Sequence, residues 1–546
     1  MPRNRVLWLV LLTTVPVLAE ALVLQGFPFS SALGLAPQLT APSPFGMFHD
    51  LRWVLVYHPS WWAFAVESVA AIVVRSLLTA GIVSVAWTDG APQRSWVYVL
   101  RMNLLFNLLV FVLLAPWAAV AVAASDISLF WFALGELAPL VFLSLVLQRG
   151  GTVADWWRRM PSAREAGWAV VAFTVLSVDA LAVYSVPGWW RVPVAVAAGA
   201  ANAWLWRMLV RTALNRRPAL RRVPAGPIAV AISAAALLGM SQFSVVGGAI
   251  AQAPPPRLDH LAGHGTRDEV IYVAGYGSAL NGATAAQARQ GRLPVIRYSY
   301  RGTDAAGQPL PYTPEDTHRS LPASARLLAA QVNIVHRRTD RPVALVAQSE
   351  GTLVVRTYLA DYPHPGVTVA ALLSPLIEPG RVYFPPPGRS GWGVATGWLL
   401  REMFAVVRDT SDSHESPDEP FIRSVVDNAP FYRTAMLCPV AGVRTVAFVP
   451  FTEAAVTPPD DAAAVPVIEL PGLHAGLLGE PDVQRRLLAV LDGRPAGTAP
   501  GTGYAVIQRA AGAWQVPTLA LGVNPAWHTA HRPDPTFGQP PCDRHG

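Results

Sequence analysis

A serine on a sharp turn is the residue of this sequence best placed for chemistry. Residues 343–346 form a short apolar run that predicts a buried strand, and the apolar spacing of residues 352–359 predicts a helix. Ser349 lies between them, in the segment A-Q-S-E-G, which follows the G-x-S-x-G pattern with Ala347 in place of the first glycine. Such a turn holds the hydroxyl clear of the backbone at the positive end of a helix, where a nucleophile is needed.

A serine hydroxyl is a weak nucleophile until a base takes its proton, and the base should follow in the chain. The best candidate is His474, in E-L-P-G-L-H-A-G-L-L, because it comes directly after a predicted strand at residues 465–470. An ordinary loop histidine is the alternative for His474. His414 is the other downstream histidine of this region, but it lies in an acidic stretch.

The histidine needs a carboxylate that orients its ring. Glu453 is the first carboxylate after a predicted strand at residues 443–449, and it is the preferred candidate. Asp460 and Asp461 are the next candidates, and Asp427 is a more distant one. A solvated loop acid is the alternative for Glu453.

Backbone amides should stabilise the oxyanion that forms when the serine attacks a carbonyl. One amide is expected from Glu350, the residue after the nucleophile. The other is expected at Tyr276, in the loop G-Y-G-S-A-L-N-G after a predicted strand at residues 270–274. The same glycines do not fit a dinucleotide fingerprint, because the third glycine and the following acidic residue are missing.

The elements before this region predict a membrane domain. The chain has 546 residues, of which 52% are hydrophobic and only 14% are charged, whereas soluble domains carry about a quarter charged residues. Each apolar segment is near or above the roughly 20 residues that a bilayer core requires. Seven segments are expected to span: Val6–Phe27, Trp62–Trp87, Met102–Ala124, Ile127–Leu147, Ala166–Val186, Val192–Val210 and Pro227–Ile250.

Arginine placement predicts a cytoplasmic N-terminus, because positive charge gathers on the cytoplasmic side of short loops. Only Arg52 and Arg191 fall in the expected outer loops. The net charge of +7 is therefore interpreted as a topology signal and not as a nucleic-acid surface. The arginines expected inside are Arg3, Arg5, Arg94, Arg101, Arg149, Arg158, Arg159, Arg164, Arg211, Arg216, Arg217, Arg221 and Arg222.

Several ionisable residues fall within the expected spans, where charge is costly. Pairing between such residues is the preferred interpretation, and a transport pathway is the alternative. They are Glu20, Glu67, Arg75, Glu136 and Asp179.

The remaining chain predicts a domain with a mostly parallel sheet, since short apolar runs alternate with amphipathic helices. The expected organisation is a membrane domain at 1–251, a proline-rich linker at 252–266, an α/β domain at 267–493 and a Pro/Gly-rich extension at 494–546. An insertion is expected at about 379–438, and a strand pair is possible at 504–508 and 514–521 in the extension.

Residues 267–493 resemble the α/β-hydrolase superfamily, in particular its lipases and esterases. The resemblance rests on V-A-G-Y-G-S as an oxyanion loop, on V-I-R-Y-S-Y-R-G as the next strand, and on the elbow A-Q-S-E-G and the histidine loop L-P-G-L-H-A-G-L-L. It implies a triad of Ser349, Glu453 and His474, an acyl-enzyme intermediate, and no metal or cofactor. The acid position does not match the usual D-x-V-V box of the family.

The expected protein is therefore a multi-pass plasma-membrane hydrolase with its α/β domain outside the cytoplasm. Its expected partners are the bilayer and an ester, thioester or acyl-lipid substrate. A largely aromatic stripe of Trp392, Trp398, Met403 and Phe404 either lies at the bilayer surface as a lid, which would favour a lipid or acylated substrate, or packs on the sheet. The alternative is a transporter, receptor or envelope scaffold with a non-catalytic outer domain. Cys438 and Cys542 could form one bridge if both face an oxidising compartment.

Overall fold

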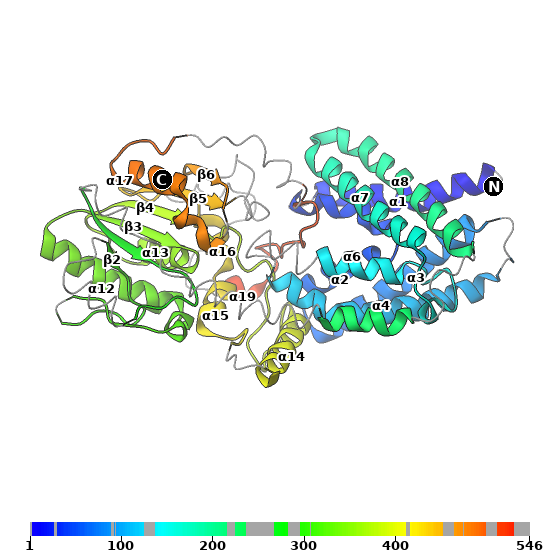
Figure 1. Ribbon diagram of the computed structural model, residues 1–546, viewed down its shortest axis with the longest axis horizontal. Helices are drawn as coiled ribbons and strands as arrows, with labels where there is room; N and C mark the ends of the chain where they lie inside the picture. Colours follow the sequence, from blue (N-terminus) through cyan, green and yellow to red (C-terminus); the bar gives the residue numbers. More distant parts are fainter. Residues whose placement is uncertain are drawn as a thin grey trace.

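The protein folds as two halves that lie side by side along its long axis (Figure 1). The computed structural model describes residues 3–26, 30–88, 92, 94–124, 137–215, 224–235, 267–281, 295–305, 307–410, 415–450, 464–472, 474–497, 510 and 512–528. The predicted linker at 252–266 and Cys542 lie outside these residues.

The N-terminal half is a bundle of helices. The chain begins at the end of the bundle that points away from the other half, which we call the far end (Figure 1). Helices α1 and α8 lie against each other, as do α3 and α4. The described elements of this half are α1 (Arg3–Gly26), η1 (Ser30–Thr40), α2 (Phe45–Val56), α3 (Trp61–Ala86), α4 (Trp96–Ala124), α6 (Ala138–Leu147), η3 (Trp156–Arg158), α7 (Ala163–Ser185), η4 (Gly188–Trp190) and α8 (Arg191–Leu214), followed by a helix at Ala225–Ala235.

Four of the described helices, α1, α3, α4 and α7, are long and apolar enough to cross a membrane. The expected number of seven spans is not confirmed. The fourth and seventh expected spans fall partly outside the described residues, and α8 carries Arg191, Arg207 and Arg211 and is not one of the four. The expected orientation of the bundle stays a prediction.

Residues 30–56, which fall between the first two expected spans, fold into the bundle. Thr40 donates from its hydroxyl to the carbonyl of Thr13, and its own carbonyl accepts from the indole of Trp206 at 2.8 Å. Thr13 lies about 20 Å from the end of α1 at Gly26, at 1.5 Å per residue. Elements η1 and α2 therefore lie inside the bundle, and Arg52 is fully buried there.

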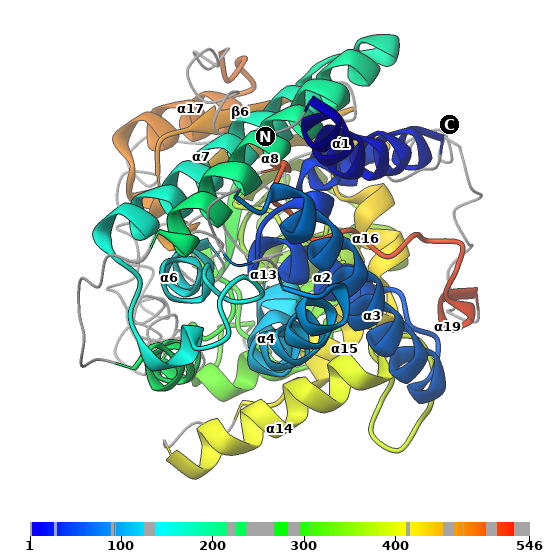
Figure 2. The same cartoon turned by 90° about the vertical axis from the view of Figure 1, so that its right-hand side faces the viewer.

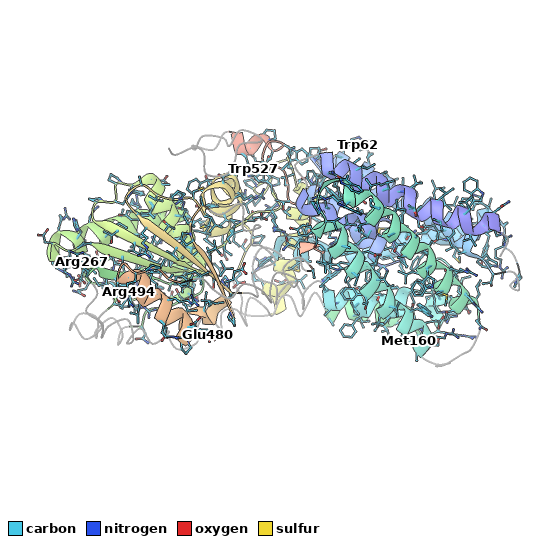
Figure 3. The ribbon with its side chains drawn as sticks, turned by 90° about the horizontal axis from the view of Figure 1, so that it is seen from above. Trp62, Met160, Arg267, Glu480, Arg494 and Trp527 are labelled. Carbon is cyan, nitrogen blue, oxygen red and sulfur yellow. The ribbon has the colours of Figure 1, made fainter. Side chains whose placement is uncertain are left out.

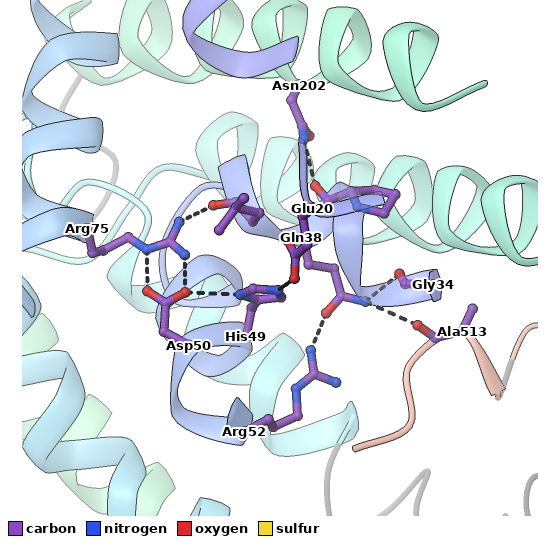
Figure 4. Close-up of polar contacts among 11 residues, drawn as sticks. Glu20, Gly34, Gln38, His49, Asp50, Arg52, Arg75, Asn202 and Ala513 are labelled. Atoms are coloured by element: carbon purple, nitrogen blue, oxygen red, sulfur yellow. Dashed lines mark hydrogen bonds and ion pairs between the residues drawn. The ribbon is translucent and has the colours of Figure 1, made fainter. Parts of the chain in front are cut away.

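Two of the ionisable residues in the expected spans bind residues of α2 (Figure 4). Glu20 of α1 contacts His49 Nε2 at 2.9 Å. Arg75 of α3 binds Asp50 with two hydrogen bonds, at 2.8 and 2.5 Å. The expected pairing of such residues with one another is therefore wrong for Glu20 and Arg75, because their partners come from a segment that lies between the expected spans.

The C-terminal half contains a six-stranded sheet in which every neighbouring pair is parallel, in the order β2-β1-β3-β4-β5-β6. The mostly parallel sheet is thus confirmed. Strands β3 and β4 are almost wholly buried, as their continuous apolar runs predict. The strands are β1 (Glu269–Val273), β2 (Ile296–Arg297), β3 (Val343–Gln348), β4 (Val367–Leu373), β5 (Arg444–Pro450) and β6 (Val467–Leu470).

Helices cover both faces of this sheet. Alternate residues of β1 enter two different hydrophobic clusters, which places one cluster on each face. Helices α12 (Leu321–Thr339) and α13 (Glu350–Asp361) pack on one face, and α17 (Pro481–Leu491) packs on the other. The short helix η5 (Pro314–His318) precedes α12.

The expected insertion at 379–438 forms three helices that lie between the two halves. They are α14 (Val394–Thr410), α15 (Pro420–Asp427) and α16 (Ala429–Ala435). Helix α14 lies crosswise to the long helices, at the edge of the molecule (Figures 1 and 2). It contacts α2, α3 and α4, so the insertion joins the α/β half to the bundle.

The extension after residue 493 also crosses the junction. Residues 514–521 form no strand, contrary to the possible strand pair, and 504–508 lie outside the described residues. The carbonyl of Trp514 accepts from Arg52 at 2.6 Å, and its indole donates to Ser177 at 3.0 Å. Trp527, in the short helix α19 (Pro525–His528), also lies at this junction (Figure 3). The extension therefore fills the core of the bundle instead of extending a sheet.

We predict that Trp514→Ala lowers the melting temperature of the full chain in detergent. The ring is 2% exposed and packs against Phe45 and Phe173, and such truncations cost about 3–5 kcal/mol. Trp189→Ala is the matched control, because that ring is 68% exposed. Equal melting temperatures for both variants would contradict this account of the junction.

Candidate active site

The turn after β3 holds Ser349 in a left-handed backbone conformation. Its φ is 53° and its ψ is −121°, values that a non-glycine residue seldom adopts. Two contacts hold the turn. The amide of Ser349 donates to the carbonyl of Leu373 on β4 at 3.0 Å, and the carbonyl of Ser349 accepts from the hydroxyl of Thr352 at 2.6 Å. The neighbouring structure therefore maintains this strained residue.

Two glycines let the elbow pack closely on β1 and the loop that follows it. A Cβ at Gly351 would lie 2.3 Å from the carbonyl oxygen of Val273, so only glycine fits there without a shift. A Cβ at Gly275 would lie 2.9 Å from the Cβ of Ser349. The loop after β1, which carries Tyr276, is thus in direct contact with the candidate nucleophile.

The structure brings Ser349 and His474 together. The distance between His474 Nε2 and Ser349 Oγ is 2.7 Å, which is a hydrogen bond. His474 begins the short helix η8 (His474–Gly479) just after β6, and both side chains are partly exposed. Because β3 and β6 are parallel members of one sheet, their following loops meet at the same edge.

Two residues that the sequence analysis did not single out hold the backbone of His474. Its carbonyl accepts a hydrogen bond from Ser374 Oγ at 2.9 Å and another from Gln348 Nε2 at 3.2 Å. The hydroxyl of Tyr272 donates to Gln348 Oε1 at 2.6 Å and fixes that amide. Ser374 directly follows β4, has a φ of 49° and is fully buried. No sequence motif identifies this bracing.

The candidate acids are not all described. Glu453, Asp460, Asp461 and His414 lie outside the described residues, so the acid of the triad stays a prediction. Asp427 is described, and it pairs with Arg423 within α15.

The two candidate oxyanion residues, Glu350 and Tyr276, both lie next to the turn of Ser349. Glu350 is the first residue of α13, so the helical ladder gives its amide no acceptor. Tyr276 donates from its hydroxyl to Glu419 of the insertion at 2.8 Å and stacks on His318, with ring centroids 4.8 Å apart. Glu419 also pairs with His318 at 3.3 Å. The insertion is therefore anchored to the loop expected to supply one oxyanion amide.

The carboxyl group of Glu350 is fully buried, and burial raises its pKa well above the usual range. Neither of its oxygens has a hydrogen-bond partner among the described residues. The hydroxyl of Tyr300, which lies beside it, donates instead to the carbonyl of Ala274 at 2.7 Å. Burial therefore favours the protonated form of Glu350 over the ionised form.

The aromatic stripe of the insertion does not pack on the sheet. Trp392, Leu399 and Met403 pack against the hydrophobic core of the bundle. Trp398 is 48% exposed and meets Trp61, at the start of α3, edge to face. Hydrogen bonds from Ala395 to His58 and from Thr396 to Leu55 hold the start of α14. The stripe is thus part of the junction with the bundle.

We predict that Glu350→Gln stabilises the protein more at pH 7 than at pH 4. The unfolded chain ionises Glu350 near its ordinary pKa, whereas burial in the folded chain raises the pKa of this carboxyl group. The free energy of unfolding therefore falls by about 1.4 kcal/mol for each pH unit between the pKa of the unfolded chain and that of the folded chain. Gln removes this penalty, and melting curves across pH measure the effect. A melting-temperature difference between variant and wild type that does not change with pH would contradict a raised pKa of Glu350.

We predict that Ser374→Ala slows the reaction of Ser349 by up to about tenfold, because one hydrogen bond to the His474 backbone is lost. The rate of covalent labelling by a fluorophosphonate measures the effect. Ser374→Gly also lacks the hydroxyl but tolerates the positive φ, so it should slow labelling equally. Restored labelling in the glycine variant would show that backbone strain, and not the hydrogen bond, is responsible.

Comparison with known proteins adds no functional information. No protein-family model, curated protein or solved structure matches this chain. The functional inference is therefore based on the contact between Ser349 and His474 and on the order of the strands that carry them.

Proposed function

We propose that this chain is a membrane-anchored serine hydrolase of the α/β-hydrolase type, which acts on an ester or thioester outside the cytoplasm. The observation that carries the proposal is the 2.7 Å contact between Ser349 Oγ and His474 Nε2 at the carboxyl edge of a parallel sheet. The order of nucleophile and histidine along the chain, and the oxyanion loop after β1, agree with the arrangement of such enzymes.

In the proposed reaction, His474 Nε2 takes the proton of Ser349 while Oγ attacks the substrate carbonyl. The amides of Glu350 and Tyr276 stabilise the oxyanion of the tetrahedral intermediate. The leaving group departs with the proton from His474, which leaves an acyl group on Ser349. Water, or another acceptor hydroxyl, then attacks this acyl group with His474 again as the base. Glu453 is proposed to orient the imidazole, with Asp460 and Asp461 as alternatives.

A lipid or an acylated molecule is the proposed substrate class. Helix α14 lies crosswise beside the bundle (Figure 1). Its exposed Trp398 contacts Trp61, the first residue of α3, and α3 is long and apolar enough to span a membrane. Tryptophan is enriched at membrane interfaces. The neighbouring Trp62 is 78% exposed on the same end of α3. These rings support a bilayer surface close to the insertion, which is itself anchored to the loop of Tyr276.

We predict that a fluorophosphonate probe labels the full chain at Ser349 and that Ser349→Ala abolishes labelling. Loss of the nucleophile or of His474 should reduce ester hydrolysis by at least about 10³-fold. Ser320→Ala is a matched control, because Ser320 makes no helix-capping hydrogen bond. Labelling of intact cells by a membrane-impermeant probe tests the side of the membrane.

Two results would contradict the proposal. Wild-type protein that is monodisperse yet neither labels nor hydrolyses short esters and phospholipid vesicles would exclude a serine hydrolase. Labelling that persists in Ser349→Ala would place the reactive residue elsewhere.

A further inference from the structure

The loop that carries Tyr276 borders the hydroxyl of the candidate nucleophile. A Cβ at Gly275 would lie 3.4 Å from Ser349 Oγ. The amide of Tyr276, the next residue, has no acceptor among the described residues, so it is available to a substrate oxygen. A donor in this place stabilises an oxyanion only if it is held in position before the reaction.

The backbone next to Tyr276 does not by itself fix this amide. Tyr276 lies between Gly275 and Gly277, and glycine allows more backbone conformations than any other residue. Gly277 has a φ of 72°, and its amide donates to Thr317 Oγ1 of η5 at 3.0 Å. That bond holds the residue after Tyr276, so the position of Tyr276 itself depends on its side chain.

The insertion holds the side chain of Tyr276. The phenol hydroxyl donates to Glu419 Oε2 at 2.8 Å, and burial raises its pKa, so the hydroxyl keeps the proton that it donates. The ring lies 5.3 Å from that of Phe421, in the first turn of α15. His318 stacks on the same ring and contacts the same oxygen of Glu419. Glu419 is therefore the polar contact that the insertion makes with this loop.

Glu419 is itself held firmly. It is 8% exposed, and its other oxygen, Oε1, accepts from the amide of Ser416 at 2.8 Å. The preceding residue, Asp418, accepts two hydrogen bonds from Arg401 of α14, at 2.6 and 2.8 Å, and such a two-point contact is directional. Because α14 contacts α2, α3 and α4, the support of the loop extends to the bundle.

We propose that Glu419 is a positioning residue for the oxyanion amide of Tyr276, an inference that rests on the proposed hydrolase function. Glu419 acts through the phenol of Tyr276 and not on the reacting atoms. The oxyanion exists only after Ser349 attacks, so a displaced amide weakens binding of the transition state and leaves binding of the substrate unchanged. Loss of this contact should therefore lower kcat at a constant KM.

The test measures hydrolysis of p-nitrophenyl butyrate by the full chain in detergent. Glu419→Ala removes the acceptor, and Tyr276→Phe removes the donor but keeps the ring. Each should lower kcat about tenfold at an unchanged KM, because a hydrogen bond to a charged group is lost. The double variant should be within about twofold of the slower single variant, since both substitutions remove the same contact.

Glu402→Gln is the matched control and should keep the wild-type kcat, because Glu402 is exposed on α14 of the same insertion. If Glu419→Ala does not fold, Tyr276→Phe, which lacks a single oxygen, decides alone. A wild-type kcat in Tyr276→Phe, or effects that multiply in the double variant, would overturn the role of Glu419 and leave the hydrolase proposal standing. Wild-type protein that neither hydrolyses the ester nor labels at Ser349 would instead contradict the proposed function, and this inference with it.

Discussion

The left-handed backbone of Ser349 is the constraint on which the arrangement of the α/β half depends. A residue in such a conformation costs about 1–3 kcal/mol and persists only where the surroundings hold it. Here β4 accepts its amide hydrogen bond, and Gly351 allows β1 to approach the first turn of α13. The same close packing places the loop of Tyr276 beside the hydroxyl. Strands β1, β3 and β4 thus hold Ser349 in its strained conformation, and the same strands position the candidate site.

Much of this half could be predicted because its signals are local. The buried strands are short apolar runs, and Ser349 and His474 follow two of them directly, so parallel pairing brings both to one edge. Gln348 and Ser374 could not be predicted, because each acts by a hydrogen bond to the backbone of a residue that is distant in sequence. The sequence places Glu453 after β5, and its position relative to His474 stays a prediction.

The bundle was harder to predict for a different reason. Elements η1 and α2 are 11 and 12 residues long, which is too short to span, so hydropathy assigned them to a loop. Contacts with distant helices, such as those of Thr40 with Thr13 and Trp206, place them inside the bundle. Non-helical turns at membrane depth are tolerated when protein surrounds them. The burial of His49 and Arg52 follows from this position.

The insertion and the C-terminal extension together make the two halves one unit. Helix α14 is held by α2, α3 and α4, and the extension is held by Arg52 and by the rings of Phe45 and Phe173. Trp514 follows the whole α/β half in the chain, yet it packs among helices that precede that half. During translation the interior of the bundle is consequently filled only after the sheet has been synthesised. Until then, the helices around Phe45 and Phe173 lack the ring that packs between them.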